Sequence, residues 1–192
     1  ATTIGLLAAI ITVVSESRLA SQTVMVDEPL FPLLVERANE VSKLIYRTPS
    51  EEAIIELTSD GWVFANKNNY PVLSGNVRSI VATIASLRRL EPKTDNPEKY
   101  ARLAVEGVGE PDAESRELIF EASDGTLLAA VIIGKMSNIM QFDPLGGTYI
   151  REIGDAVSWL ARGTVALPPS SLDFMERMVV HIPGPDIRSI TI

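Results

Sequence analysis

The chain has 192 residues, a formal net charge of -8 and no cysteine, and 46% of its residues are hydrophobic. This apolar share is enough for a packed core, which excludes a disordered chain. The acidic excess argues against a nucleic-acid partner, because phosphate binding requires clustered Lys and Arg. Disulfides, thiolate metal sites and cysteine nucleophiles are excluded, and a single histidine, His181, argues against a His-rich metal site or a Ser-His-Asp triad.

An uncharged apolar run from Ile4 to Val14 stands near the start of the chain. It is shorter than the roughly 20 residues that a membrane-spanning helix needs. Because the first residue is Ala rather than Met, we interpret residues 1–20 as the C-terminal part of a transmembrane anchor with its linker. The alternatives are a buried N-terminal helix and a signal-peptide remnant. The anchor hypothesis predicts a protein that is tethered to a membrane.

The next part of the chain predicts a short helix followed by a small meander. Pro32, within the segment 30–37, suits the first turn of a helix. Stretches of strand-forming residues separated by polar turns then predict three strands, at 41–46, 53–58 and 62–64.

The strongest helix signal follows Ser74, which is a good candidate for the N-cap. Apolar residues recur there at helical spacing on one face, at Val77, Ile80, Val81, Ile84 and Leu87. We expect this long helix to lie across a sheet and to be stopped by Pro92, with 90–94 as a short extended piece. Asn96 as cap and Pro97 at the first helical position then predict a second, short helix.

The stretch from Leu118 to Leu160 organises the chain. It contains strand signals at 118–122, 127–133, 148–153 and 157–160, and Asp124-Gly125 is typical of a hairpin turn. Four strands joined by turns predict an antiparallel meander with one buried face. Together these signals predict an α+β module over residues 30–167, in which antiparallel β-meanders are covered by one long and several short helices.

The C-terminal part resembles an earlier part of the chain. Residues 161–167 are interpreted as an extension of the sheet, and Ser171 is expected to cap a helix over 172–179. An alternating strand at 187–192 follows. The same succession of helix, link and strand occurs over 33–46, so we predict that residues 168–192 begin a second copy of the module.

The segment 135–147, between two predicted strands, is unusually apolar for a loop. Its apolar residues are Met136, Ile139, Met140, Phe142 and Leu145. The loop either folds back over the core or presents an apolar surface to a partner or a lipid. Met136, Met140 and Phe142 are therefore candidate partner-binding residues.

Arg151 is the most notable charge, because it lies within a predicted strand, two residues after Tyr149. An arginine in that place could bind an acidic group or a partner chain. The alternative is an ion pair on the exposed face with Glu152 or another neighbour. Arg151 and Tyr149 complete the set of candidate partner-binding residues.

No catalytic, cofactor or metal site is predicted. Gly134-Lys135 lacks the second glycine that a phosphate loop requires at its fixed spacing. The acidic residues between 112 and 124 do not have the spacing of a calcium loop. The pair Glu51-Glu52 is interpreted as a solvated turn.

Several short motifs resemble domain-of-unknown-function family 4340. They are Ile132-Ile133-Gly134-Lys135, the run from Gly147 to Arg151, and Val157-Ser158-Trp159-Leu160, with weaker matches at 39–41, 60–62 and 100–111. The resemblance covers roughly residues 30–192. It implies a single-pass membrane protein with a soluble, often repeated module in the bacterial envelope, encoded beside ABC transporters of the gliding-motility-auxiliary type. It implies no catalytic residues.

The function expected from these observations is that of a non-enzymatic, membrane-anchored accessory module. Its soluble part would lie in the periplasm or elsewhere outside the cytoplasm, and would dock on a transporter or another envelope protein. The alternative is a module that binds a lipid or a glycan through the loop around Phe142. A hydrolase is the third hypothesis, which the lack of a catalytic constellation disfavours.

Overall fold

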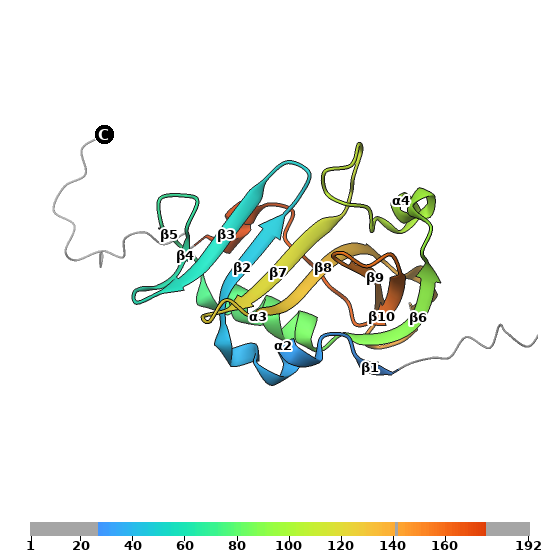
Figure 1. Ribbon diagram of the computed structural model, residues 1–192, viewed down its shortest axis with the longest axis horizontal. Helices are drawn as coiled ribbons and strands as arrows, with labels where there is room; N and C mark the ends of the chain where they lie inside the picture. Colours follow the sequence, from blue (N-terminus) through green and yellow to red (C-terminus); the bar gives the residue numbers. More distant parts are fainter. Residues whose placement is uncertain (1–26, 141, 176–192) are drawn as a thin grey trace, which may run out of the picture.

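A computed structural model describes residues 27–140 and 142–175 (Figure 1). This part of the chain forms one antiparallel sheet of ten strands, in the spatial order β1-β6-β10-β9-β8-β7-β2-β3-β4-β5. The strands are β1 (Glu28–Pro29), β2 (Val41–Arg47), β3 (Glu52–Thr58), β4 (Gly61–Phe64), β5 (Tyr70–Pro71), β6 (Arg88–Thr94), β7 (Arg116–Ala122), β8 (Leu127–Met136), β9 (Gly147–Glu152) and β10 (Ser158–Arg162).

The helices are few and short. The α-helices are α2 (Pro32–Glu36), α3 (Ser74–Ala85) and α4 (Tyr100–Leu103), and the 3-10 turns are η1 (Ala38–Glu40), η2 (Pro97–Lys99), η3 (Asn138–Met140) and η4 (Ser171–Phe174). The predicted α+β class with one long covering helix is therefore wrong, because the described chain is mostly β.

Tertiary pairing explains why the helix after Ser74 is shorter than predicted. It ends at Ala85, and the segment from Arg88 enters the sheet as β6 beside β10. Leu90 is buried between the half-buried Arg89 and Glu91, which is the alternation of a strand. Leu87, which the helical spacing predicts on the apolar face of the helix, is buried but lies beyond the helix end.

The predicted membrane anchor lies outside the described residues, as does Ile4–Val14 within it. Between 27 and 175, in the part of the chain that the structure describes, no helix combines the length and hydrophobicity needed to cross a bilayer.

The two predicted meanders are joined into a single sheet. β7, β8, β9 and β10 follow one another as antiparallel neighbours, which confirms the meander predicted from Leu118 to Leu160. β2 pairs with β3 on one side and with β7 on the other, with Leu44 opposite Phe120 and Tyr46 opposite Leu118. All four of these side chains are fully buried, so the β2–β7 pair forms the centre of the core.

Helix α3 covers one face of the sheet and carries the chain from β5 at one edge to β6 near the other (Figure 1). Its buried side chains are those that the helical spacing predicted: Val77, Ile80, Val81 and Ile84. They belong to the same core cluster as the strand residues Leu44, Ile55 and Val131. Each fully buried aliphatic side chain of this kind stabilises the fold by about 1.5–3 kcal/mol.

Residues 163–175 form a strap over the same core. The Tyr46 hydroxyl donates to the Pro168 carbonyl at 2.7 Å, and the Tyr46 and Phe174 rings lie 5.6 Å apart between centroids. The Leu73 amide donates to the Phe174 carbonyl at 3.0 Å. Residues 168–175 therefore pack on the same body as the predicted 30–167 module. Residues 176–192, the remainder of the predicted second copy, lie outside the described residues.

A second, smaller cluster lies on another part of the sheet. It consists of Tyr100, Val105 and Ile132, with Leu103 and Tyr149 packed against them. The chain reaches it through η2, which Asn96 caps by accepting from the Glu98 amide at 3.0 Å, as predicted. Gly134 allows this segment to approach β8, because a Cβ at Gly134 would lie 2.3 Å from the Leu103 carbonyl oxygen.

Replacing Gly134 with Ala is expected to destabilise the protein by about 1–3 kcal/mol, because backbone atoms must move to admit the methyl group. The matched control is Gly109→Ala, since a Cβ at Gly109 meets no atom within 4 Å. Urea denaturation measures both free energies of unfolding, and equal values for the two variants would contradict the close-packing argument.

Candidate functional site

The candidate interaction surface is the apolar loop over residues 136–145, between β8 and β9. Its exposed apolar side chains, with exposed fractions, are Met136 (61%), Ile139 (72%), Phe142 (89%) and Leu145 (60%). Exposed apolar side chains gathered in one loop are typical of a contact surface. For most of the loop the structure therefore favours the second interpretation, an apolar surface open to a partner.

The base of this loop is held in place by several contacts. The Ser137 amide donates to the Gly147 carbonyl at 2.8 Å, and the Thr164 hydroxyl donates to the Leu145 carbonyl at 3.1 Å. The Asp143 carboxylate accepts from the Leu145 amide at 2.9 Å and pairs with Arg162 at 3.2 Å. These contacts reduce the conformational entropy that the loop would lose when it binds a partner.

Met140 differs from the other candidate residues of the loop. It is half-buried, and a Cβ at Gly147 would lie 2.7 Å from the Met140 Cγ and 3.2 Å from the Leu160 Cδ1. Met140 therefore packs inward toward β9 and β10, whereas Phe142 points into solvent. The predicted fold-back of the loop applies to Met140, and the predicted exposed surface applies to Met136 and Phe142.

Arg151 is directed at groups of its own chain. Its Nε donates to the Val105 carbonyl and its Nη1 to the Asp155 carbonyl, both at 2.9 Å. Its guanidinium lies 4.5 Å from the centroid of the Tyr100 ring. Glu152, the alternative partner considered above, instead pairs with Arg89. The geometry gives Arg151 a structural role, in which it holds the segment around Tyr100 and Val105 against β9.

Tyr149 belongs to the same structural cluster. It is half-buried against the small apolar cluster of Tyr100, Val105 and Ile132, and its hydroxyl lies 3.4 Å from the Ser137 Oγ. Partner binding by Arg151 and Tyr149 stays a prediction. The structure places both side chains beside the base of the apolar loop rather than on its exposed tip.

Replacing Arg151 with Ala is expected to lower the free energy of unfolding by about 2–3 kcal/mol. The buried Val105 carbonyl loses a charged donor, and the Tyr100 ring loses a cation. Arg151→Lys keeps the charge but cannot reach two carbonyls with a rigid fork, so an intermediate loss is expected. Urea denaturation measures the losses, and hydrogen exchange should accelerate at Val105. Unchanged exchange there would contradict the structural role.

A half-buried polar network joins the strap to the sheet, and the sequence alone did not predict it. The Glu51 carboxylate accepts from the Ser171 amide at 2.7 Å and from the Ser171 hydroxyl at 2.5 Å. The Lys67 Nζ donates to the Ser171 Oγ at 2.7 Å and pairs with Glu51 at 3.4 Å. The interpretation of Glu51 as part of a solvated turn is wrong, because its carboxylate is half-buried and binds Ser171. No local pattern predicts this contact, since the two residues are 120 positions apart in the sequence.

A serine beside a lysine could in principle form a nucleophilic pair. Ser171 is fully buried, however, so a substrate has no access to its hydroxyl. The Lys67 ammonium is also paired with the Glu51 carboxylate at 3.4 Å. The network therefore fastens the strap to the sheet, and the geometry gives it no catalytic role.

Glu51 makes the attachment of the strap sensitive to pH. Although burial opposes its charge, hydrogen bonds from Ser171 hold the pKa of Glu51 below its ordinary value of 4.5. A depressed pKa contributes stability that is present above the ordinary value and is lost as the pH falls through the pKa of the folded protein.

Replacing Glu51 with Gln should therefore destabilise the protein by about 1–3 kcal/mol at neutral pH. The difference from the unaltered protein should shrink as the pH is lowered below 4.5. Urea denaturation across that range measures it, with the exposed Glu110→Gln as control. A difference that stays constant with pH would show that the charge of Glu51 does not hold the strap.

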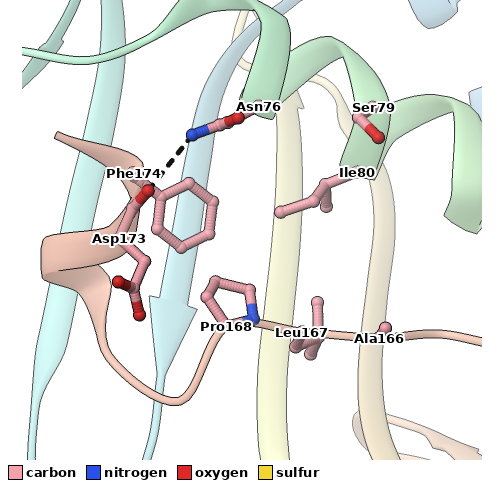
Figure 2. Close-up of a pocket in the computed structure, with 8 residues that line it drawn as sticks. All are labelled: Asn76, Ser79, Ile80, Ala166, Leu167, Pro168, Asp173 and Phe174. Carbon is pink, nitrogen blue, oxygen red and sulfur yellow. Dashed lines mark hydrogen bonds between the residues drawn. The ribbon is translucent and has the colours of Figure 1, made fainter. Parts of the chain in front are cut away.

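Three of the open hollows on the described surface have volumes of about 370, 320 and 340 Å³. Figure 2 shows the first, between α3 and the strap, where the Asn76 amide donates to the Asp173 carbonyl at 3.2 Å. Phe174 lines it but is almost completely buried, so it offers little ring surface for a sugar. This hollow brings together no acid-base pair suited to catalysis.

The second hollow is lined mostly by apolar side chains, and the third contains several charged side chains. The second lies between α3 and the strands β3 and β4, and is lined by Val41, Leu57, Trp62, Val77 and Val81 among others.

Among residues 27–140 and 142–175, no group of three or more His, Cys, Asp or Glu side chains could hold a metal ion.

Comparison of the chain with protein-family models, with curated proteins and with solved structures gives no match. The resemblance to domain-of-unknown-function family 4340 therefore stays a prediction from short motifs.

Proposed function

We propose that this protein is a non-enzymatic interaction module that presents the apolar loop 136–145 to a macromolecular partner. The proposal rests on a loop whose tip is exposed to solvent and whose base is held by hydrogen bonds and an ion pair. Phe142 is the most exposed large apolar side chain of the described chain, while Asp143 and Met140 beside it are fixed. Aromatic and methionine side chains of this kind are enriched in protein interfaces and often contribute most of the binding energy.

A protein partner fits the loop better than an anionic membrane surface does. Peripheral helices and loops that bind such membranes combine apolar residues with clustered Lys and Arg. Here the chain carries a net charge of -8. The cation Arg162 at the base of the loop is already paired with Asp143.

Addition of a partner strand to the edge of the sheet is not the mode we propose. β1 and β5, which are the outermost strands, have two residues each and contain Pro29 and Pro71. The part of β6 beyond β1 carries Pro92 and Lys93. Proline removes a backbone donor and edge charges disfavour pairing, so these edges are poor templates for another strand.

A lipid-binding function is the second candidate, and the apolar hollow beside Trp62 favours it. At about 320 Å³ this hollow could hold part of an acyl chain, and Arg78 lies at its rim to meet a head group. It is an open hollow rather than an enclosed cavity that would bury most of a lipid. The exposed loop therefore remains the stronger basis for a function.

The setting that we propose is the one expected from the sequence. The apolar run from Ile4 to Val14 would tether the module to a membrane, with the soluble part outside the cytoplasm. The partner would then be another envelope protein, such as the ABC transporter that the family resemblance implies.

Replacing Phe142 with Ser is expected to reduce partner recovery at least about 10-fold, which corresponds to the ~1.4 kcal/mol or more of an interface hot spot. Stability should remain unchanged, because the side chain is exposed. Crosslinking from a photoreactive amino acid at position 142, in the full chain within its native membranes, identifies the partner.

The matched control is Leu127→Ser, with a photoreactive residue placed at 127 in parallel. Leu127 is exposed to 53% at the opposite end of β8 from Met136. The two ends of this strand are roughly 30 Å apart at the usual rise per residue. Equal partner recovery from the Phe142→Ser and Leu127→Ser variants would rule out the loop as the docking surface.

A further inference from the structure

The third hollow, of about 340 Å³, lies where the strap passes the ends of β7 and β8. Its apolar wall is formed by small and aliphatic residues, including Ala104, Gly134, Val165 and Leu167. Its charged groups are Arg116, Lys135 and Glu114. The hollow thus combines an apolar wall with two cations and one acid.

Arg116 differs from the other half-buried arginines of the described chain. The others are held by carboxylates or by backbone carbonyls: Arg37, Arg47, Arg88, Arg89, Arg151 and Arg162. In residues 27–140 and 142–175, Arg116 forms no ion pair. Arg116 is hydrogen-bonded to the hydroxyl of Tyr46, whose own hydrogen is donated to the Pro168 carbonyl. The carboxylates of Glu51 and Asp173 also lie close enough to act on this hydroxyl electrostatically.

The remaining charges favour a ligand with one negative charge. Lys135 and Glu114 pair at 3.1 Å at the exposed rim, so they largely neutralise each other. Arg116 has no direct ion pair among the described residues, so its guanidinium can still bind one carboxylate. A carboxylate matches the planar fork of a guanidinium and carries one negative charge, whereas a phosphate dianion would leave an excess charge beside Glu114.

We propose that this hollow is a carboxylate-binding site, in which Arg116 binds the carboxylate and the wall of Ala104, Val165 and Leu167 contacts a short apolar body. Two sources share this chemistry, namely a free small carboxylic acid and an acidic side chain of a polypeptide flanked by apolar residues. Met136, the first residue of the loop 136–145, also lines the hollow, but the proposal rests on Arg116 and not on the role of that loop.

The test follows the Arg116 Nε–H resonance of the full chain by NMR while hexanoate is added, with hexanamide as the uncharged control of equal length. The resonance is assigned by its disappearance in Arg116→Gln or, should that variant not fold, in Arg116→Lys. A saturable shift with hexanoate is expected, with half-saturation on the order of 1 mM, and no shift with hexanamide.

A parallel titration with the peptide acetyl-Leu-Glu-Leu-amide distinguishes the two sources. Tighter binding of the peptide than of hexanoate supports a polypeptide ligand, and the reverse supports a free acid. The proposal is overturned if neither probe shifts the Arg116 resonance, or if hexanamide shifts it as far as hexanoate. Equal shifts of the paired Arg47 and of Arg116 would also overturn it, because they would show general charge screening.

Discussion

The pairing of β2 with β7 is the contact on which the rest of the structure depends. It places Leu44 against Phe120 and Tyr46 against Leu118, all fully buried. Without it the chain would hold two small meanders, each with an unpaired edge and half a core. With it, ten strands form one sheet, and α3 can cover the main core cluster while it carries the chain from one side of the sheet to the other.

Polar contacts then hold the segments that lie on this sheet. Arg151 binds the Val105 carbonyl, and Glu51 binds Ser171 of the strap. In both cases a charged group satisfies backbone groups that would otherwise be buried without a partner, which is costly in a low-dielectric environment. The notable charges of the sequence therefore serve the fold. Arg116 is the exception, because it has no ion pair among the described residues, and it is the basis of the carboxylate-binding site that we propose.

The same framework explains how a loop can remain both apolar and exposed. β8 and β9 fix its two ends, and Met140 packs toward Leu160 below it. Phe142 is thereby held in water without burial, at a cost of roughly 1.5–3 kcal/mol relative to a buried ring. Covering this side chain with a partner would recover that free energy, which is the physical basis of the interaction that we propose.

Local patterns were enough to predict the strands of the 118–160 meander, the apolar face of α3, the Asn96 cap and the unusual loop around Phe142. Each of these depends on neighbours within a few residues, through side-chain alternation, helical spacing or turn residues. Local patterns could not predict the union of the two meanders, the entry of β6 into the sheet, the partners of Glu51 and Arg151, or the lack of an ion pair at Arg116 among the described residues. These features depend on contacts between residues that are distant in the sequence. Many of the contacts are made by backbone groups, which all residues share, so only the packing of the whole chain decides which contacts form.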